Sequence, residues 1–313
     1  MGPKRIVVLG GGGFVGRHVV ARLVAADYRV VVPTRRRESA KHLILLPTVD
    51  VVEADVHDEN VLSRLFADAA AVVNLVGIIH EDGADTFERV HVELPRKVIA
   101  ACRAAGVARL LHMSALGASA DAPSKYLRGK AAAEAMVAAS GLQWTIFRPS
   151  VVFGREDAFL NLFARLSRAL PIVALASPKA RFQPVYVGDV AHCFVQAVDD
   201  DITYLARYDL CGPKVYTLQE LVTYVGETAG AVRPIFTLGP GLSKLQAAVL
   251  EHLPGKLMTR DNLLSMKKDN VCDCPFPAVF GIAPATLESV APSYLSPGAQ
   301  RSPFDPYRAN SGR

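Results

Sequence analysis

The chain has 313 residues, of which half are hydrophobic and 21% are charged. This is an ordinary globular composition, long enough for one large or two intertwined domains, and it excludes a largely disordered protein. The formal net charge is +5, but the basic residues are scattered, and Arg35 to Arg37 form the only tight run. We therefore exclude a nucleic-acid-binding protein.

Strand-like runs alternate with helix-length segments rich in Ala, Arg and Leu along the first half of the chain. The runs are Arg5–Leu9, Tyr28–Pro33, Asp50–Glu53, Ala71–Val76, Arg109–Met113 and Gln143–Phe147. This alternation predicts βαβ units around a doubly wound parallel sheet with helices on both faces, which is the Rossmann-type α/β class. Ligands of such sheets bind at the carboxyl ends of the strands.

The first strand runs into four consecutive glycines and then into a pattern of helical period. Glycine loses the most conformational entropy on folding, so a run of it indicates a backbone that something must approach closely. The glycines satisfy both GxxGxxG and GxGxxG, and the free N–H groups of a helix N-terminus favour a diphosphate. The predicted cofactor residues here are Gly10, Gly12, Gly13, Phe14, Val15 and Gly16, with Gly11 in the second register. The alternative is a plain turn between strand and helix.

The end of the second strand indicates which dinucleotide binds. A carboxylate about 20 residues after the glycines holds the ribose of NAD, whereas NADP needs positive charge for its 2′-phosphate. Here Thr34, Arg35 and Arg36 occupy that place, and the first acid is Glu38. Guanidinium groups bind phosphate through paired hydrogen bonds, so we expect NADP(H) in preference to NAD(H). The alternative is a solvated basic turn.

Two later strand ends add predicted cofactor contacts. Asp55 and Val56 follow the third strand, and Asp55 is placed to accept a hydrogen bond from the adenine amino group. Leu75, Val76 and Gly77 follow the fourth strand, where Val76 and Gly77 are expected to pack on the ribose. Both sets lie on the ligand side of the predicted sheet.

The stretch HMSALGASADAPSKYLRGKAAAE carries the candidate chemistry. Tyr126 and Lys130 are four residues apart in a helix-favouring segment, so their side chains share one face. An ammonium one turn away stabilises a phenolate, and we expect it to lower the pKa of Tyr126 enough for acid and base catalysis. Ser114, after the fifth strand, is placed to orient a carbonyl. The alternative is a chance pair on an exposed helix face.

Together these features resemble the short-chain dehydrogenase/reductase superfamily, whose active sites use YxxxK with an upstream Ser or Thr. The segments SKYLRGKAAAE, TIFRPSVVFGREDAFLN, FQPVYVGDVA and LMTRDNLLSMKKDNV are similar to its atypical, extended branch. That branch contains the nucleotide-binding accessory subunit of respiratory complex I and its bacterial relatives. The resemblance covers roughly Arg5 to Leu295, and it implies that Pro149, Ser150 and Val151 lie beside the nicotinamide end of the cofactor.

The same resemblance implies an incomplete catalytic set. Extended-type sugar epimerases carry several hydroxyl residues after the fifth strand, whereas Ala115 follows Ser114 here. His91 stands where such relatives often have Asn. In the complex I subunit the fold is thought to hold NADPH without demonstrated turnover, and the resemblance implies the same alternative for this chain.

Nothing in the sequence points to a metal, a secretion signal or a membrane span. The longest apolar run, Ala69 to Ile79, is interrupted by Asn74 and Gly77, well short of a bilayer. Five cysteines without a CxxC pair indicate reduced thiols. Cys272 and Cys274 lack the further ligands of a zinc site, so we expect no metal. We expect a cytoplasmic protein, soluble or peripherally bound to a membrane.

After residue 150 the regular alternation loosens. We predict an NAD(P)-binding domain over 1–150, a smaller substrate-facing lobe over 151–285 that is intertwined with it, and a mobile tail over 286–313 rich in Pro, Ser, Gly and Arg. The run LSKLQAAVLEHLPGKL starts at Leu242 and has apolar residues at helical spacing with basic ends. It packs onto its own domain or, as the alternative, meets a membrane surface or a partner.

Two functions remain open from the sequence. In the first, an NADP(H)-dependent oxidoreductase acts on a carbonyl or quinone-like apolar substrate, with Tyr126 as the proton donor. In the second, a non-catalytic dinucleotide-binding module serves a respiratory or quinone-handling protein complex at the membrane surface. The Tyr126 and Lys130 pair favours the enzyme, and Ala115 favours the module.

Overall fold

The computed structural model describes residues 2–252 and 258–298, and the chain divides into two compact units. The first unit comprises Met1–Ser150, Val187–Leu210 and Cys272–Ala283. The second comprises Val151–Tyr186, Cys211–Val271 and Pro284–Arg313. The first unit therefore includes two later segments beyond the continuous 1–150 that we expected from the sequence.

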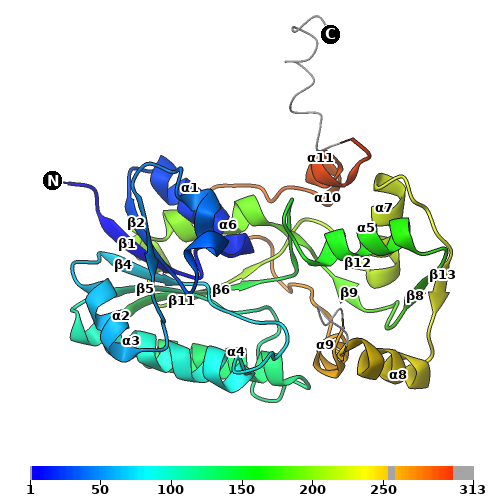
Figure 1. Cartoon of the computed structure of the whole chain (residues 1–313), viewed down its shortest axis with the longest axis horizontal. Coiled ribbons are helices and arrows are strands. Elements are labelled where there is room, and N and C mark those ends of the chain that lie inside the picture. Colours follow the sequence, from blue (N-terminus) through cyan, green and yellow to red (C-terminus); the bar gives the residue numbers. More distant parts are fainter. Residues whose placement is uncertain (1, 253–257, 299–313) are drawn as a thin grey trace, which may run out of the picture. The chain divides into compact units, whose positions relative to one another are not determined.

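A seven-stranded sheet forms the centre of the first unit (Figure 1). All its neighbouring strands are parallel, and their order is β11-β6-β5-β4-β1-β2-β3. The predicted Rossmann-type doubly wound sheet is confirmed. The strands are β1 (Arg5–Leu9), β2 (Arg29–Thr34), β3 (Val49–Glu53), β4 (Ala71–Asn74), β5 (Arg109–Met113), β6 (Gln143–Pro149) and β11 (Ala206–Leu210).

Helices cover both faces of this sheet, which is why its central strands are apolar runs without alternation. On one face α1 (Phe14–Ala25) packs against α6 (Val187–Gln196). On the other lie α2 (Glu59–Phe66), α3 (Leu94–Ala104) and α4 (Lys125–Ala138), which share a core with β1 and β4. The short helices of this unit are η1 (Arg37–Leu43), the π-helix η2 (Arg89–Glu93), η3 (Asp201–Thr203) and η4 (Ala278–Phe280).

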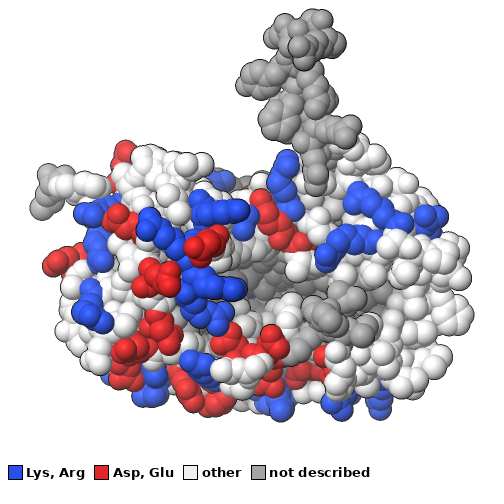
Figure 2. Space-filling model, in the orientation of Figure 1, with Lys and Arg blue, Asp and Glu red and all other residues white. Residues whose placement is uncertain are grey.

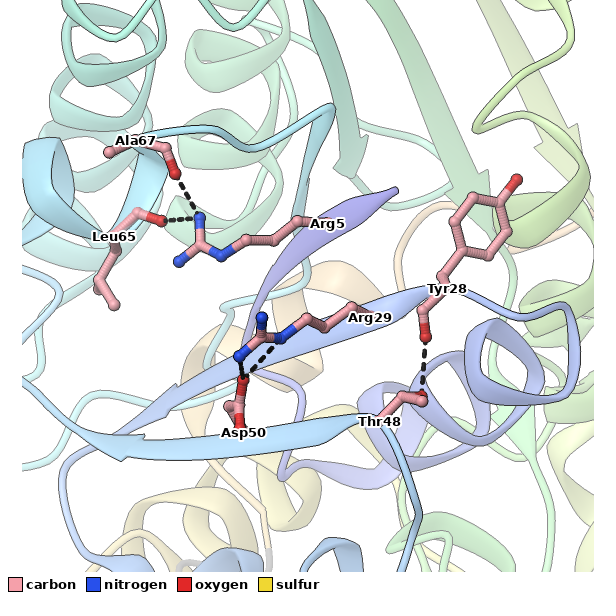
Figure 3. A network of polar contacts seen from close by, with 7 residues as sticks. All are labelled: Arg5, Tyr28, Arg29, Thr48, Asp50, Leu65 and Ala67. Atoms are coloured by element: carbon pink, nitrogen blue, oxygen red, sulfur yellow. Dashed lines mark hydrogen bonds and ion pairs between the residues drawn. The ribbon is translucent and has the colours of Figure 1, made fainter. Parts of the chain in front are cut away.

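Arginine side chains fasten the amino ends of the strands, opposite the ligand edge (Figure 3). Arg5 of β1 donates to the carbonyl oxygens of Leu65, at 2.9 Å, and Ala67, at 2.5 Å, where α2 ends. Arg29 of β2 pairs with Asp50 of β3 at 2.8 Å. Carbonyls at a helix end carry partial negative charge, so the Arg5 cation ties α2 to the sheet.

The second unit is built from three small sheets and six helices in its described part. β7 (Val152–Phe153) pairs with β10 (Val185–Tyr186), β9 (Arg181–Phe182) with β12 (Tyr216–Thr217), and β8 (Val173–Leu175) with β13 (Ile235–Thr237). The helices are α5 (Phe159–Ala169), α7 (Leu218–Thr228), α8 (Pro240–Leu250), α9 (Arg260–Ser265), α10 (Leu287–Val290) and α11 (Pro292–Leu295). A separate apolar cluster holds α5 and α7 to these sheets.

Two expectations from the sequence are wrong. The tail does not begin at 286, because α10 and α11 bury Leu287, Ala291 and Leu295 in the core of the second unit; residues 299–313 of the predicted tail lie outside the described residues. The cysteines are not all reduced: Cys211 and Cys272 are disulfide-bonded, whereas Cys102, Cys193 and Cys274 are free thiols. Nothing in the spacing of the five cysteines indicates that these two are oxidised.

Candidate functional site

The glycine loop joins β1 to α1 at the point where the strand order reverses between β1 and β4. Gly10 has a φ of +77°, and a Cβ there would lie 3.0 Å from the carbonyl carbon of Leu75. A Cβ on Gly16 would collide with the carbonyl oxygen of Gly10, because the first turn of α1 packs directly on the loop. These two glycines are therefore required by the close approach of loop, helix and β4. They bring the predicted residues Gly10 to Gly16 beside Leu75 and Val76.

The outer side of the loop is open. Gly13, the N-cap of α1, is exposed, and Gly12 is half-buried. The first turn of α1 carries no acidic residue, and no side chain caps it. Its free N–H groups and the positive end of the helix dipole therefore face an accessible space, where Phe14 and Val15 begin the helix. Such a cradle fits a diphosphate.

Gly16→Ala tests the packing of this loop. We expect the variant to lose about 2 to 4 kcal/mol of unfolding free energy, because the collision is with backbone atoms that cannot rotate away. Gly241→Ala is the matched control, since Gly241 lies in α8 with no atom within 4 Å of its Cβ position. It should be neutral or gain up to about 1 kcal/mol. Urea denaturation measures both, and equal stabilities would contradict the packing argument.

The turn after β2 holds the predicted phosphate-binding arginines. Thr34 Oγ1 donates to the carbonyl oxygen of Arg36 at 3.0 Å and lies 3.1 Å from Ser39 Oγ, so the turn is internally braced. The guanidinium of Arg35 is largely exposed and pairs with Asp85 at 2.8 Å. Arg36 is also exposed. A phosphate bound here would have to compete with Asp85 for Arg35.

The residues after β3 and β4 are fixed by local hydrogen bonds. Asp55 Oδ1 accepts from the backbone N–H of His57 at 2.9 Å, and Val56 packs against the core. Asn74, the buried last residue of β4, accepts from the N–H of Val76 at 3.2 Å and so shapes the turn to Gly77. Sequence reasoning assigned Asn74 no role, although a polar residue ending an apolar strand is a usable signal.

Tyr126, Lys130 and His91 lie together where η2 meets α4. The ring of His91 is 5.4 Å from the ring of Tyr126, and its Nε2 accepts from the N–H of Ile78 at 3.1 Å. Lys130 donates to the carbonyl oxygen of Met113 at 3.1 Å, and its Nζ would be 3.1 Å from a Cβ on Gly77. The predicted pair is thus brought beside the β4 turn. His91 lies in a π-helix, a distortion frequent at functional sites.

Burial dominates the ionisation of this cluster. It raises the pKa of Tyr126 to about 12, so the expectation that Lys130 lowers this pKa is wrong. Burial lowers the pKa of Lys130 to about 8, against a smaller opposing effect of Glu134. Burial, helped by the charge of Lys130, lowers the pKa of His91 to about 2. The imidazole of His91 is therefore neutral, as its role as acceptor from Ile78 requires.

Lys130→Met tests the buried ammonium. The folded-state pKa of about 8 is below the ordinary 10.5, so the unfolded chain binds more protons between these values and stability rises with pH there. We expect the unfolding free energy of the parent, relative to Lys130→Met, to rise by about 2 kcal/mol from pH 7 to pH 9.5. Urea titrations at both pH values measure this difference. A difference that is independent of pH would show that Lys130 is solvated.

The hydroxyl of Ser114 is hydrogen-bonded to Glu134. Ser114 is buried, and its hydroxyl lies 2.5 Å from Glu134 Oε1, which accepts it. The buried carboxylate of Glu134 also forms an ion pair with Arg148 and lies 3.5 Å from Arg207. Ala115, the next residue, packs in a small apolar cluster beside Tyr126. The candidate hydroxyl is thus held in an ionic network between α4 and β6, and Glu134 is a residue that sequence reasoning missed.

The last predicted cofactor neighbours end β6. Pro149 pairs with Leu210 of β11, and the N–H of buried Ser150 donates to the carbonyl oxygen of Leu210 at 2.9 Å. Val151 belongs to the second unit, where its N–H donates to Asn270 at 3.0 Å. Within the described residues no group of His, Cys, Asp and Glu side chains could hold a metal ion.

An open glycine cradle at the strand crossover of a parallel sheet is the arrangement typical of dinucleotide-binding Rossmann domains. Residues 10–163 match the model of an NAD(P)H-binding family. The chain is 37% identical to NADH dehydrogenase [ubiquinone] 1 alpha subcomplex subunit 9 of Arabidopsis thaliana over 223 residues, which are 68% of the chain. The chain spans a little over half of that relative, 55% of its length. The predicted resemblance to the complex I accessory subunit is therefore confirmed.

Bacterial proteins and solved structures extend the comparison. The chain is 29% identical to a ceramide reductase of Caulobacter vibrioides, over 78% of the chain and 77% of that protein. The structure of an NADPH-dependent quinone oxidoreductase of Escherichia coli, complexed with NADPH, superposes with a TM-score of 0.73 at 20% identity, covering 93% of this chain and 98% of that one. At this identity the likeness concerns the fold. Within the described residues no helix has the length and apolar character needed to cross a membrane.

Proposed function

We propose that the chain binds NADP(H) in the first unit and acts as a reductase of a carbonyl or quinone-like apolar substrate. The observation that carries the proposal is the accessible N-terminus of α1 at Gly13, on the same edge of the sheet as the Tyr126, Lys130 and His91 cluster. Gly10 to Gly16 would hold the diphosphate, Asp55 the adenine, and Leu75 to Gly77 the ribose. The nicotinamide supplies a hydride when the cofactor is bound.

The preference for NADP(H) is supported by the turn after β2. Thr34, Arg35 and Arg36 follow the strand without an intervening acid, and both arginines are exposed. Their guanidinium groups are suited to a 2′-phosphate, whereas NAD(H) selection needs a carboxylate at this place.

In the proposed reaction Tyr126 donates a proton to the substrate oxygen. Its pKa of about 12 keeps the phenol protonated at neutral pH, which suits reduction more than the reverse oxidation. Lys130 lies beside Gly77 and is placed to bind the nicotinamide ribose and to stabilise the developing phenolate. The apolar surroundings of Tyr126, formed by Ala115, Ala122 and Leu127, favour an apolar substrate.

A second function is favoured by the engagement of Ser114. Because Glu134 holds the hydroxyl of Ser114, Tyr126 is the one hydroxyl-bearing residue that we assign to a substrate carbonyl. A dinucleotide-binding module without turnover, attached to a respiratory or quinone-handling complex, would need no such donor. The similarity to a subunit of NADH dehydrogenase supports this candidate.

A mass spectrum of nucleotides released from the purified, denatured protein tests the binding that both functions share. We expect NADP(H) in near-stoichiometric amount, or a submicromolar Kd for added NADPH by fluorescence titration. A protein that retains no nucleotide and binds neither NADPH nor NADH would overturn the proposal. Turnover with a panel of quinones and carbonyls then separates the reductase from the module.

A further inference from the structure

Helix α8 of the second unit turns its large apolar side chains to solvent. Leu242, Leu245 and Val249 are each more than half exposed, at 55%, 61% and 54%. Their spacing of three and four residues places them on one helix face. A surface helix normally directs such a face to its own core, so this arrangement is inverted.

The opposite face of α8 packs against the rest of the second unit through small and polar residues. Ala247 is fully buried, and Ser243 is buried with its hydroxyl donating to the carbonyl oxygen of Gly239 at 3.0 Å. Gln246 donates to the carbonyl oxygen of Ala174, in β8, at 3.1 Å. These contacts fix the rotation of the helix about its axis. The three aliphatic side chains therefore face outward because of the fold, and rotating them inward would break the contacts.

The sheet next to α8 adds to this surface. β8 and β13 pair in a register that sets exposed Phe236 opposite Ala174, and exposed Ile172 lies two residues before Ala174 on the same side. In Figure 2 the surface over α8 and β13 is mostly white, that is, without charged side chains. A concentration of exposed apolar residues of this kind marks an interaction surface.

Charge indicates what the surface meets. α8 has no acidic residue, and its single charged side chain is Lys244. In the described part of the second unit eleven basic residues stand against eight acidic ones, whereas the first unit has one more acid than base. The outward face of α8 offers only aliphatic groups, without the Tyr, Trp and Arg side chains that are enriched in protein interfaces. Aliphatic residues beside net positive charge are typical of binding to an anionic bilayer.

We propose that the second unit docks on an anionic membrane surface by inserting the aliphatic face of α8, the side chains of Leu242, Leu245 and Val249, into the headgroup boundary. Residues 253–257, the end of the sequence run that starts at Leu242, lie outside the described residues. The docking is independent of the dinucleotide and of turnover, because none of its residues belongs to the first unit.

Sedimentation with lipid vesicles tests the proposal. The full chain is mixed with vesicles of phosphatidylcholine alone or with a third of phosphatidylglycerol, at about 0.1 M salt. We expect binding to the anionic vesicles at least about tenfold stronger than to the neutral ones, and a loss of at least about tenfold in Leu242→Gln/Leu245→Gln. Leu45→Gln/Ile202→Gln is the matched control, since both side chains are exposed in the first unit, at 90% and 73%, and it should bind like the parent.

Thermal melts of the parent and of the two double variants establish that each protein is folded. Absence of parent binding to anionic vesicles would overturn the proposal, as would equal binding by the Leu242/Leu245 variant, which would leave charge alone as the cause. Self-association of the parent on gel filtration that disappears in the Leu242/Leu245 variant, without any vesicle binding, would instead identify a second copy of the chain as the occupant.

Discussion

Tyr126→Phe is expected to reduce kcat for carbonyl or quinone reduction by about 100- to 10,000-fold while the Kd for NADPH changes less than about threefold. Removal of a positioned general acid costs this much when no other donor replaces it. Ser114 cannot take over the role without breaking its hydrogen bond to Glu134, which is also held by Arg148. The variant also keeps the phenyl ring, so its packing against Phe87 and His91 is retained.

Tyr28→Phe is the control for this experiment. Tyr28 is also half-buried, and burial together with its hydrogen bond to Asp199 raises its pKa to about 12, as for Tyr126. Tyr28 directly precedes β2, at the amino end of the sheet (Figure 3), whereas the candidate site lies at the carboxyl ends of the strands, so the loss of its hydroxyl should leave turnover unchanged. Equal turnover in the parent and Tyr126→Phe removes Tyr126 as the acid. Nucleotide binding without turnover in any of the three proteins supports the structural module.

The parts of the fold that were predictable from sequence are those set by local patterns. Six strands of the large sheet appear as short apolar runs because both faces of the sheet are covered. β11 was missed, since Ala206–Leu210 reads ARYDL and carries Arg207 and Asp209 at an edge where solvent tolerates charge. The return of α6 and β11 to the first unit depends on contacts between residues that are distant in the chain, which no local pattern encodes.

The candidate site also has features that local sequence predicts and features that depend on the packed structure. The glycines and the Tyr126 and Lys130 spacing are visible because turn geometry and helix periodicity act over a few residues. The ionisation of Tyr126 was predicted in the wrong direction, because burial is a property of the packed cluster and outweighs a neighbour one turn away. Likewise, the hydrogen bond between Ser114 and Glu134 forms only when β5, β6 and α4 pack together. Neither residue stands out in the local sequence of its own segment.

Substitution of Arg35 and Arg36 by Ala is expected to raise the Kd for NADPH by about 10- to 100-fold for each residue and to change the Kd for NADH less than about twofold. A hydrogen bond to a charged group contributes about 1.5 to 3 kcal/mol, and NADH lacks the phosphate that would receive it. Arg64→Ala is the control, because this exposed arginine lies in α2 and donates to Asn60 within its own helix. Equal affinities of the parent for the two nucleotides would contradict the clamp.

Asp85→Asn also tests phosphate binding by Arg35, but here we expect the affinity for NADPH to rise. Asp85 forms an ion pair with Arg35 at 2.8 Å, and the exposed position of Arg35 makes this ion pair weak. Its removal should free the guanidinium for the 2′-phosphate and lower the Kd for NADPH several-fold, without changing that for NADH. In an Arg35→Ala background the same substitution should have no further effect, because the gain acts through Arg35. A gain that survives in that background would assign the effect to the lost negative charge alone and exclude Arg35 from phosphate binding.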